Sequence, residues 1–330
     1  MGSPLHSAGT NDTYRRRRAA VLALLLAAVA IVAVIAVSAL GGDDDGGENV
    51  ASSAQAQEEK PKPKPKPKPP TLPNGGRRIF PDYRVVGFYG NPAADELGIL
   101  GIGPPSKVGA KLKRQAKPYA RETRPVLPAF ELISTIANAD PGEDGLYRSR
   151  MPDKLIRRYL KAARKAKALL LLDIQPGRAD FFTETTRLRK WLKQPDVGLA
   201  LDPEWRMQAD EVPGTVIGSV RAREVNATTA WLDKLVKDKN LPQKLVVIHQ
   251  FTLDMIDDRS KLKAREGLAI TLNADGFGTQ AAKLEKYKSF TRGPKRLKHG
   301  YKLFYKEDTD LMTPREVMRM KPRPDFIVYE

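Results

Sequence analysis

An alternation of short apolar segments with helical patterns limits what this chain can fold into. Eight segments after about residue 79 have the length and apolar content of strands. They span residues 84–90, 125–131, 168–173, 197–204, 244–250, 268–275, 300–305 and 325–330. Such alternation predicts α/β architecture with parallel strands, and eight repeats in about 250 residues predict a closed (β/α)8 TIM-like barrel. An open doubly wound sheet is the alternative, because no helical pattern follows the eighth segment.

Helical patterns connect most of these segments. They lie near residues 107–121, 152–165, 180–192, 224–238, 279–290 and 314–320. The second pattern is typical of a helix that covers a sheet, since its apolar residues fall on one stripe. These residues are Leu155, Ile156, Tyr159, Leu160 and Ala163.

The fourth segment, Gly198-Leu-Ala-Leu-Asp-Pro-Glu-Trp205, predicts where the chemistry is located. Every second side chain of a strand points to the same face. The face expected to line the barrel carries Gly198, Ala200, Asp202 and Glu204. Leu199 and Leu201 are expected to pack outward under helices. Asp202 and Glu204 are spaced so that both carboxyl groups can act on one bond.

The first part of the chain predicts a membrane anchor. Residues 1–18 end in four arginines, residues 19–40 are an apolar run of 22 residues, and three aspartates follow at 43–45. A run of this length crosses a bilayer, and the arginines place the N-terminus in the cytoplasm. The prediction is a single-pass protein of the cell membrane whose C-terminal domain, residues 79–330, is extracellular. A cleaved signal peptide is the alternative, and it also exports that domain.

Residues 41–78 predict a disordered linker rich in Pro and Lys. Alternating Lys and Pro at 60–70 favours an extended polyproline II stalk. The formal net charge of the whole chain is +18, which favours an anionic envelope polymer as partner; no nucleic-acid motif accompanies it. The sequence contains no Cys, so disulfide and thiol chemistry are excluded.

Acidic residues gather where the predicted strands end. Glu131, Asp173, Asp202, Glu204 and Asp275 all occupy such positions. In a barrel of this type these ends meet on one face, where catalytic residues are found. Paired carboxylates on that face are typical of glycoside hydrolysis, in which one acid protonates the leaving oxygen. Glu204 is the expected proton donor and Asp202 its helper.

Asp173 and Asp275 compete for the role of second carboxylate. The predicted substrate-binding residues are Tyr89, Glu131, Gln175, Trp205, His249, Gln250, Phe277 and Lys302. Two of the acidic residues have structural alternatives: for Asp202, a rim carboxylate that bonds loop amides, and for Glu131, a salt bridge with Arg148 or Arg150. Neither a metal nor a cofactor is expected, because the histidines are few and no nucleotide-binding motif is present. Gly276-Phe-Gly278 indicates a tight turn or, less often, an anion site.

The Asp-x-Glu at residues 202–204 resembles the end of the fourth strand in the lysozymes of glycoside hydrolase family 25, and also the end of the chitinase signature. Only Asp202 and Glu204 match. Ala200 stands where chitinases have another Asp, and residues 85–90 lack the Asp that opens the lysozyme family. The chain as a whole resembles uncharacterised membrane-anchored barrel proteins of actinobacteria, through Gln175-Pro-Gly177 and Asp202-Pro-Glu-Trp205.

The resemblance and the carboxylates together predict a glycosidase-like barrel that acts on a cell-envelope polysaccharide. A barrel that binds an envelope polymer without cleaving it is the main alternative. A structural partner of other envelope proteins is a third, and it requires a broad exposed apolar patch.

Overall fold

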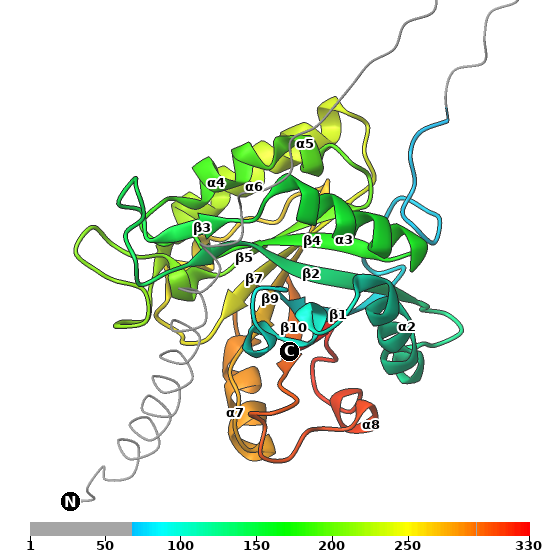
Figure 1. Ribbon diagram of the computed structural model, residues 1–330. Helices are drawn as coiled ribbons and strands as arrows, with labels where there is room; N and C mark the ends of the chain where they lie inside the picture. Colours follow the sequence, from blue (N-terminus) through cyan, green and yellow to red (C-terminus); the bar gives the residue numbers. More distant parts are fainter. Residues whose placement is uncertain (1–67, 295) are drawn as a thin grey trace, which may run out of the picture.

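Eight parallel strands form a closed barrel in the computed structural model, which describes residues 68–294 and 296–330 (Figure 1). The barrel strands are β1 (Arg84–Gly90), β2 (Val126–Ala137), β4 (Leu169–Ile174), β5 (Val197–Leu201), β7 (Lys244–Gln250), β9 (Leu268–Ala274), β10 (Lys298–Leu303) and β11 (Phe326–Tyr329). β1 pairs in parallel with both β2 and β11, which closes the ring. The predicted barrel is therefore confirmed, and the open doubly wound sheet is excluded.

Helices cover the outside of the barrel (Figure 1). They are α2 (Pro105–Ala116), α3 (Asp153–Lys165), α4 (Phe181–Arg187), α5 (Arg189–Leu192), α6 (Ala222–Asp238), α7 (Gln280–Phe290) and α8 (Pro314–Val317). The connection from β7 to β9 has no α-helix; it contains β8 (Ile256–Asp257), which pairs with β6 (Val220–Arg221). β2 runs six residues beyond the predicted end at Glu131, because β3 (Arg148–Arg150) pairs antiparallel with its extension.

Strand alternation separates two apolar cores. Leu199 and Leu201 belong to the outer core, which lies between the barrel wall and the helices, as predicted. Ala200 belongs to the inner core, together with Leu171 of β4 and Val247 of β7. Each strand therefore contributes alternate side chains to two different apolar environments, which fixes its register.

The barrel interior is crowded at Gly198. A Cβ atom at this position would lie 2.6 Å from the Leu245 carbonyl oxygen and 2.7 Å from Leu171 Cδ2. Real Cβ atoms do not approach other atoms so closely, so only glycine fits here. The small residues of β5 thus make room for larger side chains of β4 and β7.

The segment before β1 closes the end of the barrel where the strands begin. Leu72, Ile79 and Phe80 are buried against the inner core. The Arg77 guanidinium donates hydrogen bonds to the carbonyl oxygens of Pro70 and Leu241, which attach the segment to the loop before β7. The predicted boundary between linker and barrel, at residue 78, therefore lies within this buried segment, and the folded unit includes Leu72.

The predicted cytoplasmic segment, membrane span and most of the predicted linker lie outside the described residues. Within residues 68–294 and 296–330, no helix has the length and apolar character needed to cross a bilayer.

Candidate functional site

The barrel strands direct eight polar side chains into one end of the interior. These side chains, here called the inner polar ring, belong to Tyr89, Glu131, Asp173, Asp202, His249, Asp275, Lys302 and Glu330. Most follow apolar or small inward positions at a spacing of two, as Asp202 follows Gly198 and Ala200. Seven lie at or just after the carboxyl end of a strand, and Glu131 lies within β2, opposite Tyr89 of β1.

Seven of the eight side chains are buried. Glu131 and Asp173 have no exposed surface, and Asp202, Asp275 and Lys302 are each 4% exposed. Only the Glu330 side chain, at 21%, has appreciable contact with solvent. Charged groups so deeply buried must be paired, because the barrel interior solvates them poorly.

His249 is at the centre of this pairing. Its Nε2 lies 3.1 Å from Glu131 Oε1, and its Nδ1 lies 3.1 Å from Asp275 Oδ2. Burial alone would lower the pKa of His249, but the charge of Glu131 and the hydrogen bonds to both carboxylates raise it well above its ordinary value. In its protonated form the His249 imidazole is therefore placed to donate to both carboxylates.

Lys302 is the second buried cation. Its Nζ lies 3.3 Å from Asp275 Oδ2 and 2.6 Å from Glu330 Oε2, and 3.8 Å from the centre of the Tyr89 ring. Burial opposes the charged form, but Asp275 and Glu330 outweigh it and raise the pKa of Lys302. Alternating charges therefore run from the partly exposed Glu330 through Lys302, Asp275 and His249 to the fully buried Glu131.

Tyr89 connects the opposite side of the ring. Its hydroxyl donates to Asp173 Oδ2 at 3.1 Å and accepts a hydrogen bond from Gln175 Nε2 at 3.2 Å. Gln175 also accepts a hydrogen bond from the Ala137 amide, so it fixes the extension of β2 against the end of β4. Gln175 thus lies beside the ring, as predicted, in a position that orients Tyr89.

Three carboxylate oxygens of the ring have no hydrogen-bond partner: Glu131 Oε2, Asp173 Oδ1 and Asp202 Oδ1. Buried oxygens of this kind are costly unless they are protonated or are satisfied by a ligand or water. They come from three strands that are consecutive in the barrel, β2, β4 and β5. The ring therefore has unused acceptor capacity on one side.

Burial raises the pKa values of two carboxyl groups of the inner polar ring. Burial raises the pKa of Asp173 to about 6, with His249 and Glu131 acting in opposite directions. Burial also raises the pKa of Asp202 well above its ordinary value; His249 opposes this, and the negative charges of Asp173, Glu204 and Asp275 add to it. This shift favours the protonated form of Asp202.

Glu204 lies next to the ring, in the short 3-10 helix Pro203–Trp205. It is 4% exposed, and its charge acts on Asp202. Trp205 is half-buried beside it. Phe277 is half-buried too, packed edge-to-face on Phe304 at 5.8 Å between ring centres. Both aromatics lie just beyond the ends of β5 and β9, as predicted.

Gln250 does not belong to the site. It follows His249 directly, so it points to the outer face of the barrel wall, where its Oε1 accepts a hydrogen bond from Arg259 Nε at 2.8 Å. Its side-chain amide also donates to the Thr252 carbonyl oxygen. It fixes the connection between β7 and β9. The structure thus places Gln250 away from the inner polar ring, and its role in substrate binding stays a prediction.

The predicted alternative for Glu131, a salt bridge with Arg148 or Arg150, is wrong. Both arginines pair with Glu184 of α4, outside the barrel wall. Sequence reasoning missed two other site residues, Glu330 and Asn273. The Asn273 side-chain amide lies 3.3 Å from His249 Nδ1. The spacing of two from Phe326 through Val328 to Glu330 is the signal that identifies Glu330 as inward-facing.

A hollow of about 210 Å³ reaches the ring from outside, next to β1, β10 and β11. Its lining includes Gly98, Ile99, Tyr305 and Glu330. Since Glu330 is the partly exposed member of the ring, this hollow is where solvent meets the chain of alternating charges. Glu330 is the one member of the inner polar ring that lines this hollow, and the other seven are buried behind it.

No group of three or more His, Asp or Glu residues suited to a metal ion occurs in the described part of the chain. The chain matches no protein-family model, and no curated protein is significantly similar to it. The resemblance to family 25 lysozymes therefore depends on Asp202 and Glu204 alone.

Proposed function

We propose that this barrel is a glycosidase-like enzyme that cleaves a cell-envelope polysaccharide with carboxyl groups of the inner polar ring. The observation that carries the proposal is the contrast between Asp202 and Asp275. Asp202 is buried with a raised pKa and an unpaired oxygen, whereas Asp275 is paired with the cations of His249 and Lys302. A neutral acid beside an ionised carboxylate is what glycoside hydrolysis requires.

Asp202 is the proton donor in this proposal, a role that the sequence alone assigned to Glu204. The raised pKa of Asp202 favours its protonated form, which can give a proton to the departing glycosidic oxygen. Glu204 then acts beside it, through the charge that favours protonation of Asp202. Asp275 or Asp173 supplies the second carboxylate, which stabilises the positive charge that develops on the sugar.

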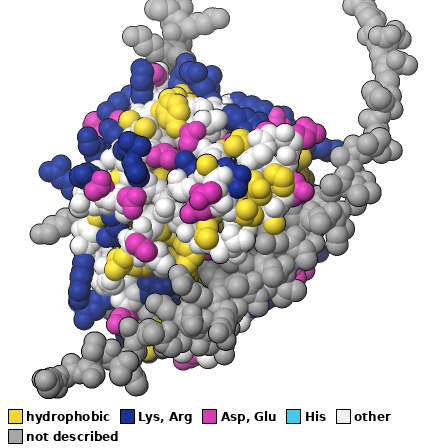
Figure 2. All heavy atoms as spheres, turned by 90° about the vertical axis from the view of Figure 1, so that its left-hand side faces the viewer, with side chains coloured by type: hydrophobic (Ala, Val, Ile, Leu, Met, Phe, Trp, Pro, Cys, Tyr) yellow, Lys and Arg dark blue, Asp and Glu magenta, His cyan; other side chains and the backbone are white. Residues whose placement is uncertain are grey.

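The proposed setting is the outer surface of a cell membrane. The apolar run at residues 19–40 serves as a single-pass anchor, and the Lys-Pro stretch holds the barrel away from the bilayer. The positive net charge of +18 favours contact with an anionic wall polymer or polysaccharide. Figure 2 shows Lys and Arg side chains around the margin of one face, interspersed with Asp and Glu.

The test is a screen of the full-length chain for release of reducing sugar from a panel of glycans and peptidoglycan. We expect Asp202→Asn to lower turnover by about 10²-fold or more, because general acid catalysis contributes that much. The thermal unfolding midpoint at pH 7 should not fall, since burial favours an uncharged side chain at this position. Wild-type chain that turns over none of these substrates would refute the enzyme proposal.

Glu204→Gln is the matched comparison. If Asp202 is the donor, Glu204→Gln retains measurable turnover with an altered pH profile, because the charge that favours protonation of Asp202 is lost. Complete loss in Glu204→Gln together with retained activity in Asp202→Asn would reverse the two roles.

A polymer-binding barrel without catalysis is the second candidate, and the deep burial of the ring favours it. None of the four predicted catalytic carboxylates, Asp173, Asp202, Glu204 and Asp275, is more than 4% exposed. This candidate predicts saturable binding of an envelope polysaccharide with no release of sugar. It also predicts that Asp202→Asn leaves the binding affinity unchanged, which separates it from the enzyme proposal.

A further inference from the structure

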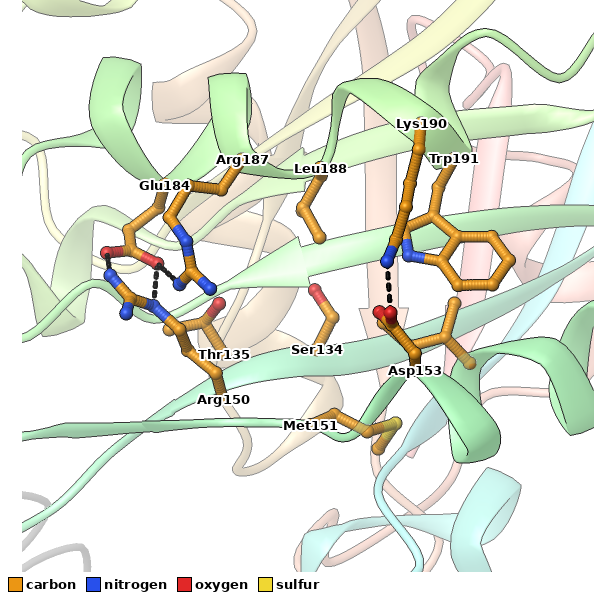
Figure 3. A pocket seen from close by; sticks show the side chains of 11 residues that line it. Ser134, Thr135, Arg150, Met151, Asp153, Glu184, Arg187, Leu188, Lys190 and Trp191 are labelled. Carbon is orange, nitrogen blue, oxygen red and sulfur yellow. Dashed lines mark hydrogen bonds and ion pairs between the residues drawn. The ribbon is translucent and has the colours of Figure 1, made fainter.

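A second cavity, of about 350 Å³, lies outside the barrel wall (Figure 3). It is bounded by the end of β2, the segment from β3 into α3, and helices α4 and α5. Its volume falls in the range that holds a small ligand. Ser134 and Thr135 line it from β2, Arg150 from β3, and Arg187 and Lys190 from the helices.

Glu184 is the negative group at one side of this cavity, and two arginines already pair with it. Arg150 donates to it through Nε at 2.9 Å and Nη2 at 2.6 Å, and Arg148 Nε donates at 2.9 Å. Glu184 is 1% exposed, so these contacts hold a buried carboxylate between two guanidinium groups. Arg148 also pairs with Asp144 through Nη2 at 2.9 Å, so two guanidinium groups are matched by two carboxylates before Arg187 is counted.

Arg187 brings a third cation that this carboxylate does not satisfy. Its Nη1 lies 3.8 Å from Glu184 Oε2, which is beyond hydrogen-bonding distance, and its side chain is 50% exposed. Figure 3 shows the Arg187 and Arg150 guanidinium groups side by side at one end of the cavity. Two guanidinium groups in this arrangement offer several N–H donors to a single oxyanion.

The other carboxylate of the cavity, Asp153, is engaged as well. It forms an ion pair with Lys190 at the opposite end, beside the Trp191 indole (Figure 3). The two carboxylates that line the cavity thus have cationic partners, and the excess charge lies at Arg150 and Arg187. The Thr135 side chain stands next to these arginines in Figure 3 and adds a hydroxyl group.

We propose that this cavity binds a small saccharide that carries an oxyanion group, either a phosphate or a carboxylate. Arg187 and Arg150 hold the oxyanion, and the space toward Lys190 and Trp191 accommodates the sugar body. Only β2 and β4 separate this site from the inner polar ring, since the Ser134 hydroxyl donates to the Asp173 carbonyl oxygen at 2.9 Å. The inference does not depend on glycan cleavage.

Isothermal titration calorimetry of the full-length chain in detergent tests this inference. The ligands are glucose 6-phosphate, glucuronate and, as the uncharged reference, glucose. We expect saturable binding of at least one charged sugar and none of glucose. Binding of glucose 6-phosphate alone, or of glucuronate alone, would identify the preferred oxyanion. Equal binding of all three sugars, or of none, would overturn the proposal.

Two variants locate the binding. Arg187→Gln should weaken binding of the charged sugar by at least tenfold, because it removes the cation without a hydrogen-bonded protein partner. Arg189→Gln is the matched control: it makes the same charge change two residues away, on an exposed side chain that does not line the cavity. Equal weakening in both variants would indicate attraction by net charge alone and would overturn the assigned site.

Discussion

His249 lies between two carboxylates, with Nε2 3.1 Å from Glu131 Oε1 and Nδ1 3.1 Å from Asp275 Oδ2. A single imidazole ring therefore bridges the carboxylate oxygens of Glu131 and Asp275. In the doubly protonated form the imidazole donates to both, whereas a neutral ring can donate to only one. The inner polar ring is held together by this cation.

The pKa of His249 should therefore be far above that of an ordinary histidine. Because Glu131 and Asp275 raise it, the imidazolium persists to a higher pH than in an ordinary histidine, and the stability it contributes is lost only as pH rises through the folded-state pKa. NMR titration of the imidazole signals measures this. His299, whose pKa burial lowers, should titrate below its ordinary value, and His299→Gln assigns its signal. A His249 signal that titrates near pH 6.5 would contradict the pairing.

Removing the Lys302 ammonium should destabilise the barrel strongly. Lys302→Met leaves Asp275 and Glu330 without their shared cation, and breaking a buried pair in this way costs about 3–5 kcal/mol. Urea unfolding at pH 7 measures the change. Lys306→Met is the control, because Lys306 is exposed on the following loop and should change stability by no more than about 0.5 kcal/mol. Similar losses in both variants would show that Lys302 is not held as described.

The convergence of charged residues was predictable because side chains alternate between the two faces of a strand. Residues two apart in a strand share a face, so Asp202 faces inward like Ala200. In the same way Asp173 faces inward like Leu171, and His249 like Val247. The same rule, applied strictly, excludes Gln250 from the interior. Gln250 was included only because it lies beside His249 in the sequence.

Other features depend on contacts that no local pattern contains. Glu184 pairs with Arg148 and Arg150 across more than thirty residues, and its helix gives no sign of which arginines it meets. Leu72 was assigned to the linker because it follows a Lys-Pro stretch, although it is only 2% exposed. Nor does spacing alone show that the ring is buried, because burial depends on how the loops cover the strand ends.

Asp173 should make the folded protein less stable as pH rises from about 4 to about 6. Its pKa is about 6 in the folded state and about 3.9 when unfolded, so the folded state binds the proton more tightly, and its ionisation costs stability on the order of 3 kcal/mol. Asp173→Asn removes this cost. The variant should gain stability relative to wild type between pH 4 and pH 7 in urea unfolding.

The comparison for Asp173→Asn is Asp95→Asn, which changes an exposed carboxylate outside the ring. Its unfolding free energy should differ from that of wild type by a nearly constant amount over the same pH range. A parallel pH dependence of Asp173→Asn and wild type would mean that Asp173 ionises normally.

Gly198→Ala should destabilise the protein because the barrel interior has no room for the methyl group. The nearest atom, 2.6 Å away, is the Leu245 carbonyl oxygen, which belongs to β7 and cannot move without disturbing the sheet. We expect a loss of about 1–3 kcal/mol or more. Gly87→Ala is the matched control, since its nearest neighbour lies at 3.3 Å, and it should be much milder. Differential scanning calorimetry distinguishes them, and equal unfolding midpoints would contradict the packing. Adding Leu171→Val should not rescue Gly198→Ala, because the backbone contact remains.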